Sequence, residues 1–471
     1  MYCALCGVQL PEGVTYCPNC GIELCEDNML RDPKPKQPLG GIVTASSYAP
    51  PKRKRKLSAG HFLFMIPLLI LVGFVSMVVI MFTADPATEV APTVELFHAG
   101  LTPVMVSDGE NDPLWGYINR DGDEVITAKF DEVTDFGDNG LAAVCYLGQW
   151  GFINKNGDFV IEPVYEDAQN FGENDYAPVK ANGSWGYIDE KGALVINPQF
   201  DSACTFAKNG LALVGIGDKY GYINRKGVYV IAPQYDDAES FGASGYAAIY
   251  AFGKWGLIDK NGEYVINPQF DALYPFASNG LALVEKDGAY GYIDRMGVYA
   301  IQPVFEAASS FGDNGLAVVK KDGKYGYIDA SFSYVIEERF DMAYPFAADG
   351  SCAAVCPDAE TGLWGYIDYY GKYVIEPTYT AAGTFRNGIA AVKDAEGLVY
   401  VDKQGEEVYR PDTECLFITH FTEDGYGILA FLDQATGNMV FRVINKKGKF
   451  VTETAYPMVS FSILTDLILT K

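Results

Sequence analysis

The sequence predicts an all-β tandem-repeat array, either β-propeller-like or an open superhelical β-array, preceded by a small zinc ribbon and one transmembrane helix. Three observations lead to this prediction. An aromatic-Gly pair recurs every 35 residues through much of the chain, an uncharged apolar run precedes it, and two Cys-x-x-Cys pairs lie near the N-terminus. A fixed period of this length is typical of stacked repeats, in which each unit buries its apolar face against its neighbours.

The aromatic-Gly pair opens the first predicted strand of each unit. In a strand, the aromatic residue and the residue two positions later share one face, and the following Ile takes the other. Both faces are then apolar, as expected for a sheet packed between two copies of itself. The interval is 35 residues between the first seven pairs and 39 before the eighth. The aromatic residues are Trp115, Trp150, Trp185, Tyr220, Trp255, Tyr290, Tyr325 and Trp364.

Turn residues and aromatic spacing predict the rest of the unit. An Asn or Asp ends the first strand, and Gly follows three residues later except after Asp329, where Phe332 takes its place. This pattern favours a tight hairpin, because the Asx side chain caps the backbone and Gly takes a positive φ. We expect a return strand that a Pro usually stops, a third strand with two aromatics six residues apart, and a fourth strand with Gly-Leu-Ala, as in residues 210–214.

The number of units bears on whether the array closes. Eroded copies at residues 398–405 and 443–448 bring the total to about ten, and residues 100–104 form a fourth-type strand ahead of the first pair. This offset lets the last unit be completed by a strand from elsewhere, as in ring-closing propellers. Against closure, 35 residues is short beside the roughly 40 to 45 of common blades, and ten units exceed the usual number of about four to eight. An open array therefore stays as an alternative.

The repeat region, over residues 98–455, resembles the bacterial WG-repeat family. The resemblance is carried by W/Y-G-Y-I-D/N-x-x-G combined with P-x-F/Y-D/E, and the Trp-Gly form itself occurs at Trp115, Trp150, Trp185, Trp255 and Trp364. The resemblance implies an all-β repeat array, commonly in envelope-associated proteins. It implies no family-wide activity and no catalytic residues.

Two recurring residue types have both a structural and a functional interpretation. The aromatic rows either form the core between units or stack on glycans, and the adjacent Gly favours burial because it permits close backbone approach. An acid follows the opening aromatic of the third strand in seven units, with Thr380 as the exception; it either caps a turn, the interpretation we favour, or holds Ca²⁺ around a channel. These acids are Asp131, Glu166, Asp201, Asp236, Asp271, Glu306 and Asp341. The inserted residues 357–362 lie in one connection between strands, and insertions in repeat arrays often lie on the binding face.

The apolar run at residues 62–82 contains 21 residues and no charge. At about 1.5 Å per residue it reaches roughly 31 Å, one hydrocarbon thickness. A signal peptide is the alternative, but its apolar core would lie near the start of the chain. Five basic residues at 52–56 precede the run, and acids follow it at Asp85 and Glu89. The positive-inside rule then places the N-terminus in the cytosol and the repeats outside the cell membrane, although the basic run alone could also be a nucleic-acid or nuclear-import patch.

The N-terminal segment resembles the short zinc ribbons of many bacterial membrane proteins. Cys3, Cys6, Cys17 and Cys20 supply four thiolates for a tetrahedral, structural Zn²⁺ with no open position for catalysis. A pair of disulfides is the alternative, which a reducing cytosol disfavours. Cys25 lies beyond the pattern. The expected domains are a zinc ribbon (1–25), a Pro-rich basic linker (26–56), a transmembrane helix (57–83), a spacer (84–97) and the repeat domain (98–471).

Charge and motif content limit the function. Residues 57–471 carry 27 Lys and Arg against 56 Asp and Glu, so nucleic acid is excluded as a partner, which leaves proteins, cations and neutral glycans. The repeats contain no catalytic motif, and their two histidines, His98 and His420, lie outside the regular units. The five cysteines after residue 82 are an odd number, and no disulfide is expected among them. We therefore expect a non-enzymatic, single-pass cell-surface binding or scaffolding protein; the alternatives are a cell-wall glycan-binding module or glycan hydrolase, and a transmembrane signalling receptor.

Overall fold

The computed structural model describes residues 2–3, 29–30, 95–107, 112–172, 175–411, 415–434, 436–452, 454–459 and 468–470. The chain divides into two compact units, Met1–Phe82 and Thr83–Lys471. In the first unit, β1 (Tyr2–Cys3) pairs with β2 (Met29–Leu30) in an antiparallel arrangement. The predicted ligands Cys6, Cys17 and Cys20, the linker at 26–56 except for β2, and the apolar run lie outside the described residues. Among the residues with described positions, none forms a helix long and apolar enough to cross a membrane.

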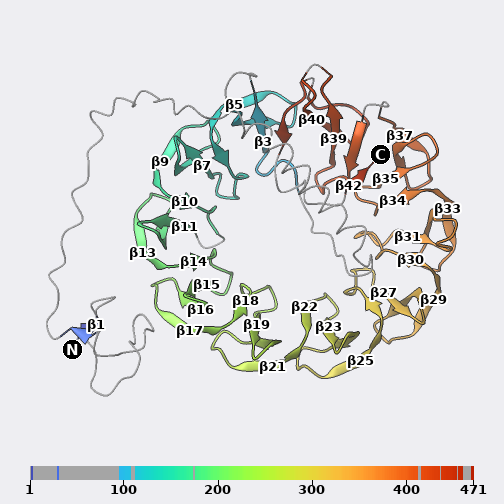
Figure 1. Cartoon of the computed structure of the whole chain (residues 1–471), viewed down its shortest axis with the longest axis horizontal. Helices are drawn as coiled ribbons and strands as arrows, with labels where there is room; N and C mark the ends of the chain where they lie inside the picture. The colour runs from blue at the N-terminus through green and yellow to red at the C-terminus, as the bar shows by residue number, and fades with distance from the viewer. Residues whose placement is uncertain are drawn as a thin grey trace. The chain divides into compact units, whose positions relative to one another are not determined.

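The second unit is a ring of ten four-stranded antiparallel sheets, which we number blade 1 to blade 10 in chain order (Figure 1). Each of blades 2 to 9 uses four consecutive strands, and the fourth strand lies at the rim. Blades 2 to 5 comprise β6 (Glu132–Val133), β7 (Ala142–Tyr146), β8 (Gln149–Ile153) and β9 (Phe159–Tyr165); β10 (Asp167–Ala168), β11 (Tyr176–Ala181), β12 (Ser184–Asp189) and β13 (Leu194–Phe200); β14 (Ser202–Ala203), β15 (Leu211–Ile216), β16 (Lys219–Asn224) and β17 (Tyr229–Tyr235); and β18 (Asp237–Ala238), β19 (Ala247–Ala251), β20 (Lys254–Ile258) and β21 (Tyr264–Phe270).

Blades 6 to 9 repeat the same order. They comprise β22 (Ala272–Phe276), β23 (Ala282–Lys286), β24 (Ala289–Ile293) and β25 (Tyr299–Phe305); β26 (Ala307–Ala308), β27 (Leu316–Lys321), β28 (Lys324–Asp329) and β29 (Tyr334–Phe340); β30 (Met342–Ala343), β31 (Ala353–Cys356), β32 (Trp364–Ile367) and β33 (Tyr373–Tyr379); and β34 (Ala381–Ala382), β35 (Ile389–Lys393), β36 (Leu398–Asp402) and β37 (Glu407–Tyr409).

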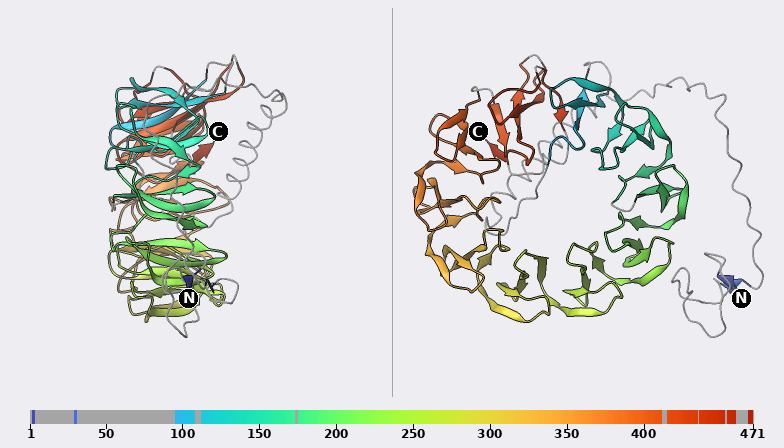
Figure 2. Two further views of the ribbon diagram at one scale, coloured as in Figure 1. Left: turned by 90° about the vertical axis from the view of Figure 1, so that its left-hand side faces the viewer. Right: turned by 180° about the vertical axis from the view of Figure 1, so that it is seen from behind.

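Blade 1 closes the ring with a strand from the far end of the chain. Its outer strands are β3 (Leu101–Val106), β4 (Leu114–Asn119) and β5 (Glu124–Phe130), while its first strand is β41 (Met458–Val459). Val459 pairs with Val104, and Met458 with Met105. Figure 2 shows the resulting ring from the side and from behind. The second unit is therefore a ten-bladed propeller arrangement, and the open array is wrong.

Blade 10 departs from the common pattern. Its sheet runs β42 (Ile468–Thr470), β38 (Cys415–Thr419), β39 (Tyr426–Leu432) and β40 (Met439–Asn445). Where the other blades have a fourth strand, this blade has isolated bridges between Phe441 and Tyr456 and between Ile444 and Phe450. The sequence erosion in the tenth unit thus coincides with the loss of a regular outer strand.

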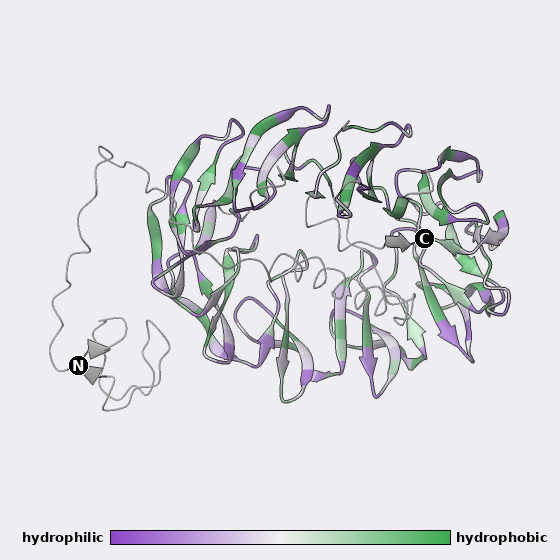
Figure 3. Cartoon of the chain, turned by 45° about the horizontal axis from the view of Figure 1, so that its top comes forward, coloured by the Kyte–Doolittle hydropathy of each residue, from purple (hydrophilic) through white to green (hydrophobic). Residues whose placement is uncertain are grey.

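The core consists of apolar clusters between neighbouring blades. In one of them, Trp115 and Tyr117 of blade 1 pack with Ala142, Val144 and Ile153 of blade 2. One blade contributes its aromatic face and the next its Ile face, as both apolar faces of the predicted strand require. Hydrophobic stretches accordingly follow the strands, while hydrophilic ones gather at turns (Figure 3).

The most buried ring in each unit is not the aromatic of the aromatic-Gly pair. Tyr187, two residues after Trp185, has no exposed surface, whereas Trp185 itself is half-buried. Trp185 pairs with Lys180 beside the hairpin turn, whereas Tyr187 pairs with Pro178 further into the sheet. Trp150, Tyr220, Trp255 and Tyr290 are likewise half-buried, and Trp115, Tyr325 and Trp364 are buried.

The predicted third strand is instead the joint between two blades. Tyr165 ends the fourth strand of blade 2, Asp167–Ala168 forms the first strand of blade 3, and Phe171 follows in the connection. Both aromatics contact one cluster of apolar residues, so the two rings six residues apart belong to the same core. The Pro expected to stop the return strand, Pro163, lies inside β9, where an outermost strand tolerates its missing N–H.

Candidate functional site

The turns between the second and third strands of the blades lie on one side of the ring. We call this surface the hairpin face; it also includes the residues that lead from the fourth strand of one blade into the next blade. The opposite face carries the turns between first and second strands and between third and fourth strands. The turns of the hairpin face in blades 2 to 9 are residues 147–148, 182–183, 217–218, 252–253, 287–288, 322–323, 357–363 and 394–397.

In six blades the recurring acid at the start of the blade caps the turn of the same blade. The Glu166 carboxylate, for example, accepts a hydrogen bond from the backbone N–H of Gly183 at 3.0 Å. The same contact is made by Asp131 to Gly148, Asp201 to Gly217, Asp271 to Asp287, Glu306 to Gly323 and Asp341 to Ala359. The turn-cap interpretation is thereby confirmed. No group of three or more potential ligands that could hold a metal ion exists within the described part of the chain, so nothing supports the Ca²⁺ alternative.

Three of these acids also join neighbouring blades through lysines. Asp236 pairs with Lys219, Asp271 with Lys254, and Asp341 with Lys324. The hydrogen bond from Lys254 is the largest cause of the lowered pKa of Asp271. These pairs lie at the surface, with carboxylates between 23% and 49% exposed, so each contributes little stability by itself. Their effect is to fix where one turn lies relative to the next.

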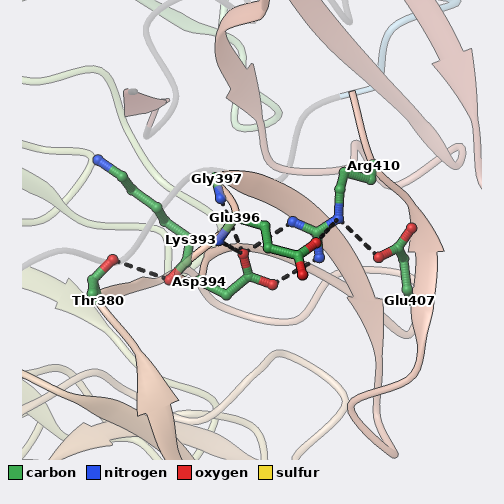
Figure 4. A network of polar contacts seen from close by, with 7 residues as sticks. All are labelled: Thr380, Lys393, Asp394, Glu396, Gly397, Glu407 and Arg410. Atoms are coloured by element: carbon green, nitrogen blue, oxygen red, sulfur yellow. Dashed lines mark hydrogen bonds and ion pairs between the residues drawn. The ribbon is translucent and has the colours of Figure 1, made fainter. Parts of the chain in front are cut away.

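Blade 9 fastens its turn in a different way, because Thr380 replaces the acid (Figure 4). Thr380 Oγ1 donates to the carbonyl of Lys393 at 3.2 Å. The turn itself carries Asp394, whose two oxygens accept from Nη1 and Nη2 of Arg410 at 3.0 and 2.7 Å. Arg410 Nε also donates to Glu407 at 2.9 Å. Hydrogen bonds from Arg410 hold the pKa of Asp394 below its usual value, so this bidentate pair takes over the role of the missing cap.

The inserted connection of blade 8 forms an ordered loop on the hairpin face. Asp358 accepts the backbone N–H of Glu360 at 2.9 Å with its side chain and that of Gly362 at 3.0 Å with its carbonyl. Asp341 caps the loop through Ala359 at 2.8 Å. The insertion therefore adds acidic surface beside the Arg410 network of the next blade without loosening the turn.

The eight regular units match the WG containing repeat family at residues 115–149, 150–185, 185–220, 220–250, 255–288, 290–325, 325–356 and 364–396. The chain belongs to this family. Residues 2–24 match the zinc-ribbon domain. No curated protein matches the chain.

Solved structures similar to this WG-repeat protein resemble it only distantly. A eukaryotic initiation factor is 10% identical and covers 76% of this chain and 96% of its own, with a TM-score of 0.45. Kluyveromyces lactis Hsv2 carrying a Gly-Ser linker in place of loop 6CD is 11% identical, covers 50% and 89%, and has a TM-score of 0.30. The extracellular domain of a putative one component system from B. thetaiotaomicron is 11% identical, covers 79% and 74%, and has a TM-score of 0.24.

The two histidines of the second unit, His98 and His420, lie outside the regular repeat units. His420 is buried against Gly383, and its Nδ1 has no hydrogen-bond partner in the described part of the chain. Burial lowers the pKa of His420 to about 3, so its imidazole is neutral at pH 7. Five cysteines of the second unit are free thiols, as predicted; they are Cys145, Cys204, Cys352, Cys356 and Cys415.

Two residues of the hairpin face escaped the sequence analysis. Leu147 and Phe252 are 56% and 90% exposed at the tips of their turns. An alignment of the repeats at the turn would have found them, because the equivalent positions in other blades hold Asn182, Asp287 and Asp322.

Proposed function

We propose that this WG-repeat protein is a non-enzymatic, single-pass cell-surface binding or scaffolding protein. In this proposal residues 57–83 cross the cell membrane, the N-terminus is cytosolic, and the ring outside the cell binds a protein or another envelope component through its hairpin face. The observation that carries the proposal is the set of caps on that face. Six acids and the Arg410 network hold turns of differing sequence in fixed positions, which is how rigid scaffolds present binding residues on loops.

The zinc ribbon supports a structural metal at the cytosolic end of the proposed protein. Cys3, Cys6, Cys17 and Cys20 provide four sulfur donors in two closely spaced pairs, a donor set suited to tetrahedral Zn²⁺. The strand pairing between Cys3 and Met29 brings the ends of this segment together. Bound zinc would supply folding energy that so small a segment cannot obtain from a core.

Site-specific photocrosslinking in intact cells tests the binding function. A benzophenone side chain is placed at Asn182 or Asp322 on the hairpin face, and at Lys226 or Ser331 on the opposite face as controls. Crosslinked products are expected from the first pair only. Equal yields from both faces would contradict the proposal. Protease added outside the cells should degrade a tag in the ring and spare a tag at the N-terminus, and the reverse pattern would contradict the proposed topology.

Glycan binding is a second candidate, favoured by the half-buried aromatics at the edge of the hairpin face. Trp150, Trp185 and Trp255 each keep part of the ring in solvent, and such rings can stack on sugars. Binding of purified neutral wall glycan, weakened by Trp185→Leu but not by Asp218→Asn, would support this candidate. No change on either substitution would exclude stacking on this ring.

A further inference from the structure

The turns of the hairpin face impose the same unusual backbone on different residues. In six blades the first residue of the two-residue turn has a positive φ, and these residues are Leu147 (54°), Asn182 (53°), Gly217 (54°), Phe252 (56°), Asp287 (54°) and Asp322 (50°). Asn and Asp tolerate this region because their short polar side chains bond locally. Leu and Phe have no such compensation, so blades 2 and 5 use a residue that the turn disfavours.

Phe252 and Leu147 are also exposed to solvent, which is unfavourable for large apolar side chains. Phe252 is 90% exposed and Leu147 is 56% exposed, so neither gains the burial that usually offsets an unfavourable backbone. The three sibling turns demonstrate that Asn or Asp satisfies the same fold. The side chains of Phe252 and Leu147 are therefore not explained by folding, and a residue that breaks two local rules without a structural gain points to a function.

The surroundings of Phe252 define the chemistry of a partner. Tyr250 and Trp255 lie on the same hairpin with ring centroids 5.3 Å apart, which makes this the most aromatic turn of the hairpin face. Asp237 pairs opposite Tyr250 in the sheet and is exposed, while Asp271 is partly neutralised by Lys254. An exposed apolar tip thus stands among carboxylates on a strongly acidic chain.

The acidic charge around Phe252 limits which kinds of partner can bind there. Anionic lipid headgroups would be repelled by the acidic face, and a second copy of the same face would be repelled for the same reason. A glycan would stack on a supported ring such as Trp255 rather than on a side chain that projects into solvent. A protein that offers an apolar pocket bordered by Lys and Arg complements both the tip and its charges.

We propose that Phe252, with Leu147 as a second contact, anchors a protein whose binding surface combines an apolar pocket with basic side chains. This inference rests on the proposed binding function of the hairpin face. Phe252 enters the pocket, and Asp237 and the neighbouring carboxylates meet the basic rim. Encounter is accelerated by the opposite charges and weakened by salt.

Selection of displayed random peptides on the full-length, N-terminally tagged protein tests this inference. The variants are Phe252→Asn, which installs the residue of the sibling turn at 182, and Met296→Asn, which removes a 75% exposed apolar side chain from the opposite face. Selected peptides are expected to combine Trp, Phe or Leu with Lys or Arg. Their affinity should fall about tenfold or more for Phe252→Asn, and stay unchanged for Met296→Asn. Thermal unfolding temperatures no lower than that of the parent protein confirm that the fold of both variants is intact.

The outcomes separate the inference from the proposed function. If peptides bind both variants as tightly as the parent protein, or if acidic peptides are selected, the role of Phe252 is overturned while binding by the ring stands. If no peptide is enriched on the parent protein, both are overturned. If the affinity also falls tenfold for Met296→Asn, binding is not confined to the hairpin face and the inference fails.

Discussion

The carboxylate of Asp424 accepts a hydrogen bond from the backbone N–H of Phe97 at 3.0 Å, although the two residues are 327 positions apart. Its other oxygen accepts the N–H of Leu96 at 3.0 Å. The Phe97 ring meets Tyr426 at a centroid distance of 4.6 Å. This contact joins blade 10 to the segment that leads into blade 1, beside the strand pairing that closes the ring.

Asp424→Ala should therefore destabilise the ring strongly. The two amides belong to fully buried residues, Leu96 and Phe97, and would lose charged acceptors. We expect the free energy of unfolding to fall by about 3 kcal/mol, measured by urea denaturation followed by tryptophan fluorescence. Glu423→Ala is the matched control and should change the value by less than about 0.5 kcal/mol. Similar losses for both variants would show that the Asp424 contact does not stabilise closure.

The Gly of the aromatic-Gly pair should be irreplaceable for a steric reason. A Cβ built on Gly151 would lie 2.6 Å from the carbonyl oxygen of Ile161 and 2.7 Å from Pro163 N, both in the backbone of the outer strand. Gly151→Ala should cost about 2 to 4 kcal/mol of unfolding free energy.

Gly183→Ala is the control for that substitution, because its Cβ would meet nothing within 4 Å and only its φ of +80° is unfavourable. This variant should cost about 1 kcal/mol. If calorimetry finds the two losses equal, crowding against the outer strand is not what demands Gly in the pair.

His420 should make the ring less stable in acid. Burial first, and then the charge of Arg386, lower its pKa to about 3 from an ordinary value of 6.5. Between pH 6.5 and 3, His420 is therefore protonated in the unfolded chain and neutral in the folded chain. The stability that the fold has with neutral His420 is complete above pH 6.5. It is lost as the pH falls toward 3, at about 1.4 kcal/mol per pH unit.

The variant His420→Gln should remove that part of the pH dependence. Urea unfolding at pH 7, 6, 5 and 4 is expected to show a slope smaller by about one proton than in the parent protein. Identical slopes in the two proteins would rule out His420 as the source.

The zinc ribbon should bind metal independently of the ring. The purified full-length protein is expected to contain one zinc ion per chain by atomic emission, and Cys17→Ser should lose it because three sulfur donors hold Zn²⁺ poorly. Cys25→Ser should retain the metal. Retention of zinc by Cys17→Ser would mean that the ligand set is wrong.

The local sequence predicted the blades well because the same turn and strand residues recur in each unit. The Asx-Gly turn is formed as expected, with the Asn119 side chain accepting the N–H groups of residues 121 and 123, and Gly122 at a φ of +86°. Phe332, which replaces this Gly in one unit, adopts the same left-handed conformation with a φ of +67°. The acid caps were also recognisable, because carboxylates next to turns commonly accept backbone N–H groups.

Features that depend on distant partners could not be predicted. Met458–Val459 is too short to show a period, so only its pairing with β3 reveals its role. The joint between blades looked like one strand because its two aromatics are six residues apart, and sequence alone does not show that the sheet changes between them. The left-handed backbone at Phe252 and Leu147 was not predictable either, because the repeat period is carried by the strands while the turn residues differ from blade to blade.

Closure by β41 has a consequence for biogenesis. The first blade stays an open edge until residues 458–459 have been made, so β3 exposes unpaired N–H and C=O groups until then. Premature termination before residue 458 leaves that edge permanently available to other chains. Such truncated products should aggregate or attract proteolysis, because their ring cannot close.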